Sequence, residues 1–270
     1  MGAAEREIIA VRGLAKHYAT AGAPVIALQD IDFTIDEGEL VAVVGPSGCG
    51  KSTLLKILAG LLPPTHGEAL LRGSPIAGPR RDIGVVFQAP VLFPWRNVRD
   101  NVLLPIDVQR LGREKHLRLA ADLLALVGLA GFEERYPWEL SGGMQQRVAI
   151  VRALIHDPAM LLMDEPFGAL DAMTREQMNV ELQRIWLEKR KTVLFITHSI
   201  AEAVFLADRV LVMTPRPGRI MDDLRVTLAR PRPLEVLNTP QFGAYAQRIR
   251  ACFSAPATSL GADLRSGGLG

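Results

Sequence analysis

Short runs of consecutive apolar residues alternate with amphipathic stretches along most of this chain. Five runs have the length of a strand: Leu40–Val44, Ile83–Phe87, Ala159–Met163, Val193–Ile196 and Val210–Met213. Apolar runs of this kind are typical of parallel strands that helices cover on both faces. Two earlier segments, Ile8–Val11 and Ile31–Ile35, also read as strands, the second with alternating polarity. The pattern predicts an α/β fold preceded by a small β region.

Five stretches show helical character. The predicted helices are Ser52–Leu62, ended by Pro63, then Glu114–Val127, Gly143–Ile155, Thr174–Lys189 and Thr239–Phe253. Between Gln88 and Leu140 there is no strand signal, which predicts a helical insertion in the α/β core.

Composition narrows the class of protein. The chain has 270 residues, a net charge of +2 and two cysteines. This charge gives no electrostatic indication of a nucleic-acid partner, and two cysteines make no disulfide framework. The longest apolar runs fall far short of the ~20 residues that span a bilayer. We therefore expect a reduced, soluble protein that depends on other chains for any membrane spans.

A phosphate-binding loop follows the run Leu40–Val44. Gly45, Pro46, Ser47, Gly48, Cys49, Gly50, Lys51, Ser52 and Thr53 match the G-x-x-x-x-G-K-S pattern, between a predicted strand and a predicted helix. Backbone N–H groups and the helix N-terminus would cradle phosphates. Lys51 would reach the β and γ phosphates of ATP, and the Ser52 hydroxyl would bind Mg²⁺.

Two acidic residues end a later apolar run. Asp164 and Glu165 follow Met160–Met163, at the carboxyl end of a predicted buried strand, where open α/β sheets bind ligands. Asp164 would hold Mg²⁺, and Glu165 would act as the general base toward the attacking water.

A second glycine-rich turn, Ser141–Gly143, opens another predicted helix. It has two interpretations. Ser141 is a good helix N-cap, so the turn could serve capping alone. Adjacent glycines at a helix N-terminus also form an anion site, and a two-fold dimer would place this turn on the γ-phosphate held by the partner's loop.

With these motifs in order, the sequence resembles the ATP-binding cassette (ABC) family over residues 7 to 225, although Met144 stands where the family's signature commonly has Gln. The resemblance assigns Tyr18 to stacking on adenine, Gln88 to Mg²⁺ and water, His198 to the γ-phosphate, and Asp171 to contact across the dimer. It implies ATP and Mg²⁺ as cofactors. It also implies a P-loop NTPase (RecA-like) core with an N-terminal antiparallel β subdomain and an inserted α-helical subdomain, at about residues 89–157. We expect residues 226–253 to be a C-terminal extension and residues 254–270 to be a disordered tail.

Several details are similar to prokaryotic importers of the nitrate, sulfonate and taurine type. They are a cassette without fused membrane spans, the form of the motif Phe167–Asp171, the apolar stretch Pro90–Asn101 and the turn Thr214–Ile220. This implies a homodimer that works with two integral-membrane permease subunits and a solute-binding protein, at the cytoplasmic face of the inner membrane and without nucleic acid. A basic tail, Arg225, Arg230 and Arg232, is expected to form a solvated surface.

The alternatives are a soluble ABC protein that acts on ribosomes or DNA, and a P-loop kinase. The first usually carries two cassettes or a long coiled coil, and the second leaves Ser141–Gly143 and His198 without a role.

Overall fold

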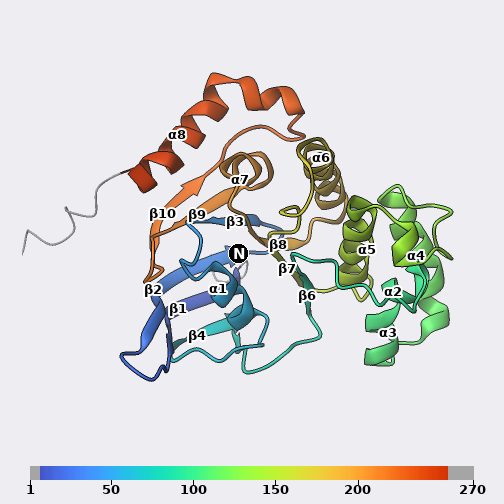
Figure 1. Ribbon diagram of the computed structural model, residues 1–270, viewed down its shortest axis with the longest axis horizontal. Coiled ribbons are helices and arrows are strands. Elements are labelled where there is room, and N and C mark those ends of the chain that lie inside the picture. Colours follow the sequence, from blue (N-terminus) through green and yellow to red (C-terminus); the bar gives the residue numbers. More distant parts are fainter. Residues whose placement is uncertain (1–6, 255–270) are drawn as a thin grey trace, which may run out of the picture.

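Two β-sheets organise the protein in the computed structural model, which describes residues 7–254 (Figure 1). Of the predicted tail, only Ser254 lies within the described residues. The first sheet is antiparallel, in the order β2-β1-β4-β5. Its strands are β1 (Glu7–Tyr18), β2 (Val25–Asp36), β4 (His66–Leu71) and β5 (Ser74–Pro75).

The second sheet has six strands in the order β10-β9-β3-β8-β7-β6. They are β3 (Leu40–Val44), β6 (Ile83–Val86), β7 (Met160–Asp164), β8 (Thr192–Ile196), β9 (Arg209–Met213) and β10 (Ile220–Arg225). All pairings are parallel except that of β10 with β9. The five predicted apolar runs form the parallel strands, and β3, β8 and β9 are buried throughout, as continuous apolar runs predict.

Helices cover this sheet on both faces. Helix α1 (Lys51–Leu58) lies beside the antiparallel sheet, and the opposite face carries α6 (Ala172–Lys189), α7 (Ile200–Leu206) and α8 (Pro240–Ser254). The segment between β6 and β7 is helical and stands to one side of the sheet (Figure 1). It holds α2 (Val98–Val102), α3 (Leu104–Gln109), α4 (Arg113–Leu126), a 3₁₀ turn (Pro137–Glu139) and α5 (Gly142–Leu154).

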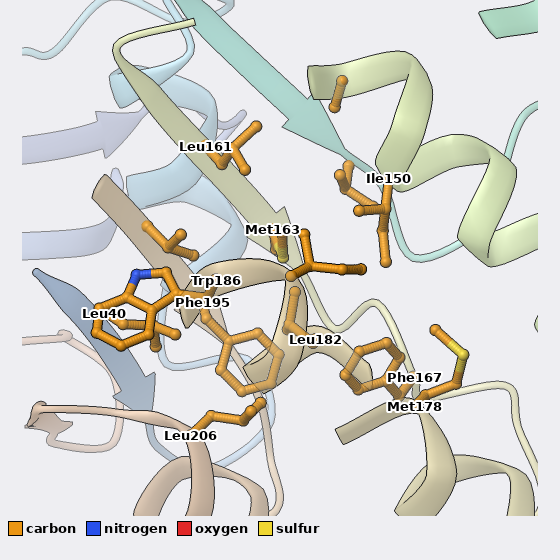
Figure 2. Packing of buried hydrophobic residues seen from close by; sticks show 14 of the residues in the cluster. Leu40, Ile150, Leu161, Met163, Phe167, Met178, Leu182, Trp186, Phe195 and Leu206 are labelled. Carbon is orange, nitrogen blue, oxygen red and sulfur yellow. The ribbon is translucent and has the colours of Figure 1, made fainter. Parts of the chain in front are cut away.

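Two apolar cores follow from this layering. One lies between the antiparallel sheet, α1 and the parallel sheet. The larger joins the other face of the parallel sheet to α5, α6 and α7, where Met163, Phe195 and Trp186 pack together (Figure 2). The sheet is therefore held on both faces, which fixes the strand ends that carry the polar residues described below.

Some element bounds differ from the sequence prediction. Helix α1 ends at Leu58 rather than at Leu62. The reason is Gly60, which has a φ of 70°, while the N–H of Leu61 donates to the carbonyl of Lys56 to close the helix. Strands β4 and β5 escaped prediction because the first half of β4 is exposed and has no apolar alternation.

The basic tail was predicted wrongly for two of its three arginines. Arg225 is exposed, but Arg232 is only 1% exposed and donates from Nη1 to the carbonyls of Val204, Phe205 and Ala207. Arg230 pairs with Asp208, and its guanidinium lies over the ring of Trp186. Arg230 and Arg232 therefore bind the chain after β10 to the end of α7. This structural role could not be predicted from the residue types alone.

Among residues 7–254, no helix is both long enough and apolar enough to cross a lipid bilayer.

Candidate functional site

The loop Gly45–Gly50 joins the end of β3 to the start of α1, as the motif predicts. Gly48 and Gly50 adopt φ values of 74° and 108°, which favour glycine. A Cβ on Gly45 would lie 2.8 Å from Sγ of Cys49, whose side chain is buried beneath the loop. The loop therefore curls with its backbone toward solvent, ahead of the N-terminus of α1.

Lys51 holds the first half of this loop. Its side chain is buried, and Nζ donates to the carbonyls of Gly45 at 2.8 Å and Pro46 at 3.0 Å. The ammonium group is thus positioned inside the loop, where it can neutralise a bound phosphate.

A cavity of about 270 Å³ opens beside the loop. Tyr18, at the end of β1, lies at this cavity with its hydroxyl 3.3 Å from Oγ1 of Thr53. The remaining lining residues are Val25, Ala27, Ser47, Gly48, Gly50, Lys51, Ser52, Glu165 and Arg216. An exposed aromatic ring, phosphate-binding N–H groups and a cation thus share one cavity, which suits a nucleotide.

Asp164 ends β7 opposite the start of α1. The Ser52 hydroxyl donates to Oδ1 of Asp164 at 3.2 Å, which joins the two predicted metal residues. Burial raises the pKa of Asp164 and the neighbouring charge of Glu165 raises it further, while the hydrogen bond from Ser52 opposes them. A hydroxyl and a carboxylate that converge beside a phosphate site fit Mg²⁺, which takes oxygen ligands and shares them with phosphates.

Glu165 contacts His198, the second residue after the adjacent strand β8. Its carboxylate Oε2 lies 3.1 Å from Nδ1 of His198, just after β8. The N–H of Glu165 donates to the carbonyl of Ile196, and its φ of 44° is left-handed. A Cβ built on Gly168 would lie 3.4 Å from Nε2 of Gln88 and 3.6 Å from the same Oε2, so Gln88 faces this carboxylate across Gly168.

The turn Ser141–Gly143 does not line this cavity. The Ser141 hydroxyl accepts a hydrogen bond from the N–H of Met144 and caps α5, which Figure 1 shows well apart from α1. A Cβ on Gly143 would lie 2.9 Å from Thr174, so the turn packs against the start of α6. Asp171 caps α6, and hydrogen bonds from Thr174 lower the pKa of its carboxyl group.

A model of the ABC transporter family matches residues 28–168. The chain belongs to this family. It is an ATP-binding, ATP-hydrolysing cassette with the fold that the sequence predicts.

Relatives of this cassette include an uncharacterized ABC transporter ATP-binding protein of Methanocaldococcus jannaschii. The two are 50% identical over 82% of this chain and 83% of the relative. The taurine import ATP-binding protein TauB of Escherichia coli strain K12 is 50% identical over 76% of this chain and 80% of its own length.

Solved structures of ABC cassettes have the same fold. A dimeric bacterial ABC transporter cassette superposes with a TM-score of 0.72 at 34% identity, over 82% of this chain and all of that one. A dimer in a post-hydrolysis state, bound to ADP and Pi, gives a TM-score of 0.70 at 32% identity, with the same shares covered. A third is cbiO1 of Clostridium perfringens, part of an ABC transporter complex, with a TM-score of 0.71 at 31% identity, covering 82% of this chain and 89% of that one.

One polar cluster of this cassette escaped the sequence analysis. Arg175, on α6, donates to the carbonyls of Phe167, Gly168 and Leu170 and lies 3.5 Å from Glu202. Burial raises the pKa of Glu202, which accepts a hydrogen bond from Thr197. The cluster ties the loop after Glu165 to α7. Only the acidic and basic residue types could have drawn attention to it.

Proposed function

We propose that this cassette powers an ABC importer for taurine or a related small sulfonate or anion. The taurine importer name of the relatives supports the solute class, and the fold and the nucleotide cavity support the energy source. The observation that carries the proposal is the grouping of polar residues at the phosphate loop: Lys51 and Glu165 line the cavity, Asp164 accepts from the Ser52 hydroxyl, and His198 contacts Glu165.

Each residue then has a role in hydrolysis. Lys51 binds the β and γ phosphates. Glu165 accepts the proton of the attacking water. His198 faces Glu165 with Nδ1 and offers Nε2, which has no hydrogen-bond partner among residues 7–254, to the γ-phosphate. Tyr18 stacks on the adenine. Ser52, Asp164 and Gln88 hold Mg²⁺, which neutralises phosphate charge when bound.

The turn Ser141–Gly143 acts on the nucleotide of a second copy. Its place outside the cavity supports this role, because Ser141 and Gly142 are exposed and do not line the nucleotide cavity of their own chain. The dimeric state of the solved cassettes supports it as well. In a two-fold dimer, each turn and each Asp171 would complete the partner's site, so ATP binding closes the dimer and hydrolysis opens it.

An apolar surface on the helical insertion is the proposed dock for the permease subunits. A hollow of about 400 Å³ lies there, lined by Phe87, Val91, Phe93 and Val108 among others. Val91, Trp95 and Val108 are 59%, 71% and 72% exposed. Large apolar side chains gathered around a hollow suit an amphipathic helix of a partner.

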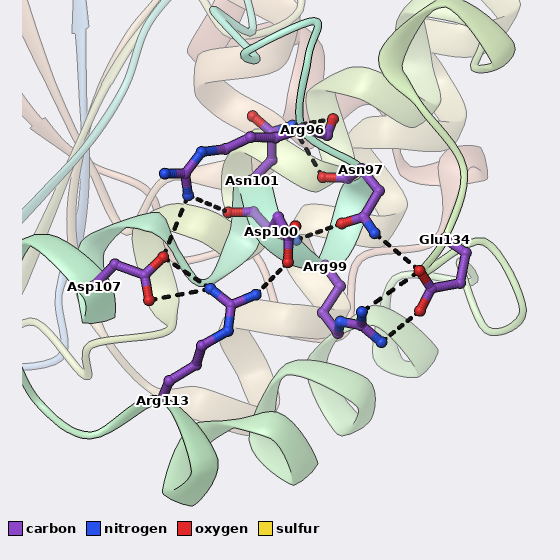
Figure 3. A network of polar contacts seen from close by, with 8 residues as sticks. All are labelled: Arg96, Asn97, Arg99, Asp100, Asn101, Asp107, Arg113 and Glu134. Carbon is purple, nitrogen blue, oxygen red and sulfur yellow. Dashed lines mark hydrogen bonds and ion pairs between the residues drawn. The ribbon is translucent and has the colours of Figure 1, made fainter.

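Polar contacts hold the segment that carries this surface, and Figure 3 shows those that join Arg96, Asn101, Asp107 and Arg113. The fully buried amide of Asn101 accepts from the N–H of Phe93 and donates to the carbonyls of Phe93, Arg96 and Asn97. Arg113 pairs with Asp100 and Asp107 beside it. The loop that follows Gln88 is therefore held in one conformation. We propose that it links the nucleotide site to the apolar surface.

We further propose that the complex includes two permease subunits and a solute-binding protein, with this chain at the cytoplasmic face of the inner membrane. A soluble ABC protein acting on ribosomes or nucleic acid is not favoured, because the taurine import relatives match three quarters of the chain.

Solute uptake in the source cell tests the proposal. Cells that carry Glu165→Gln as their only copy should lose uptake of labelled taurine, or of another sulfonate or nitrate. Unchanged uptake of every solute would contradict this solute class, and a ribosomal rather than membrane distribution of the protein would contradict transport.

The docking surface has its own test. Trp95→Ala with Val108→Asp should abolish uptake while the purified cassette still hydrolyses ATP. Leu61→Asp, at a half-exposed apolar residue beyond α1, is the matched control and should leave uptake unchanged.

A further inference from the structure

A turn between β9 and β10 places an exposed arginine at the nucleotide cavity. Arg216 lines this cavity beside Ser47 and Gly48, and its Nε donates to the carbonyl of Gly48 at 3.2 Å. It also borders a second hollow, of about 670 Å³, on the His198 side of the phosphate loop. The guanidinium thus stands on the solvent side of the phosphate loop.

The turn that carries Arg216 is fixed by hydrogen bonds. The Thr214 hydroxyl donates to the carbonyl of Pro217 and accepts from the N–H of Arg219. The N–H of Gly218 donates to the carbonyl of Ala27 on β2. A Cβ on Gly218 would lie 2.1 Å from the carbonyl oxygen of Cys49, so the turn packs directly on the phosphate loop.

Two cations therefore bind carbonyls of the phosphate loop. Lys51 is buried and binds the carbonyls of Gly45 and Pro46, whereas Arg216 is exposed and binds the carbonyl of Gly48. No carboxylate of residues 7–254 forms a salt bridge with Arg216, whereas the neighbouring Arg219 pairs with Asp30 at 3.0 Å. The charge of Arg216 thus borders the cavity without a salt-bridge partner among the described residues.

We propose that Arg216 is a further nucleotide-binding residue, whose guanidinium contacts the phosphate chain of ATP. A guanidinium suits this ligand because its planar fork of N–H groups matches phosphate oxygens. The Nε bond to the Gly48 carbonyl keeps the fork at the loop.

Titration of a fluorescent ATP analogue into the purified full-length cassette tests this assignment. Arg216→Ala should weaken binding of the analogue about tenfold or more, the effect of losing a charge-assisted hydrogen bond. Arg216→Lys should restore part of the affinity. Arg219→Ala, on the same turn, should bind as the wild type does. Affinity within twofold of wild type in Arg216→Ala would overturn the proposal.

The salt dependence of binding separates a phosphate contact from a structural role. The affinity of the wild type should fall more steeply with salt than that of Arg216→Ala, because a screened charge has been removed. If wild type and Arg216→Ala showed equal salt dependence, or if Arg219→Ala lost as much affinity as Arg216→Ala, the conformation of the turn and not the guanidinium would determine binding. The inference rests on ATP binding in this cavity, so Lys51→Ala is the reference. If Lys51→Ala also bound the ATP analogue normally, the assignment of this cavity as the ATP site would be wrong.

Discussion

Nδ1 of His198 lies 3.1 Å from Oε2 of Glu165, so the second residue after β8 contacts the residue after β7. Neighbouring parallel strands bring the two side chains to one edge of the sheet, together with the phosphate loop after β3. This contact holds the carboxylate in one orientation at the cavity.

Replacing Glu165 with glutamine separates binding from hydrolysis. The amide keeps the size of the side chain but does not accept the proton of water, so ATP affinity should be retained while turnover falls roughly 100-fold or more. The variant should accumulate as an ATP-bound dimer in size-exclusion chromatography. Normal turnover would show that Glu165 is not the base.

Gly142→Asp tests the role of the Ser141–Gly143 turn. Gly142 is exposed, and a Cβ there would meet only Leu170, at an ordinary 3.8 Å. An acidic residue in the first turn of α5 also favours the helix. The monomer should therefore stay folded and bind ATP, while the charge repels the partner's γ-phosphate and ATPase activity falls at least tenfold. Gly22→Asp, at an exposed glycine with free space, is the control, and equal activity of the two variants would contradict a role in trans.

Arg232→Met should destabilise the fold. The change leaves the carbonyls of Val204, Phe205 and Ala207 without the donor at the end of α7. Burial lowers the pKa of Arg232 to about 10, which reflects the cost of burying this charge and reduces the net loss. We expect a loss of about 2–4 kcal/mol in the free energy of unfolding, measured by urea denaturation. Arg250→Met, at an exposed position on α8, should change it by less than about 0.5 kcal/mol.

Glu202→Gln should alter the dependence of stability on pH. Burial raises the pKa of Glu202 in the folded protein, although Thr197 and Arg175 oppose the shift. Its contribution to stability is therefore greatest below the usual pKa of glutamic acid and is lost as the pH rises through the raised value. The free energy of unfolding of the variant should improve relative to wild type as the pH rises from about 4 to 7. A difference that is constant over this range would contradict the shifted titration.

The sequence predicted the parts of the site that depend on local order. A phosphate loop between a strand and a helix, and acids at the end of an apolar run, are recognised from neighbouring residues alone. Lys51, Ser52 and Asp164 were therefore singled out from the sequence, and their roles stay predictions. Arg216 was not, because its place depends on the bridge between Gly218 and β2, nearly two hundred residues apart. Arg232 was misjudged for a related reason: the carbonyls that bind it belong to α7 and to the chain between β10 and Arg232.

Residue 165 adopts a left-handed backbone conformation, with a φ of 44°, although it is not glycine. Such a conformation costs a side-chain-bearing residue on the order of 1 kcal/mol, and glycine would adopt it without strain. Glu165→Gly should therefore raise the unfolding midpoint while it removes the proposed base. If Glu165 is the base, selection for thermal resistance alone would favour an inactive residue at this position.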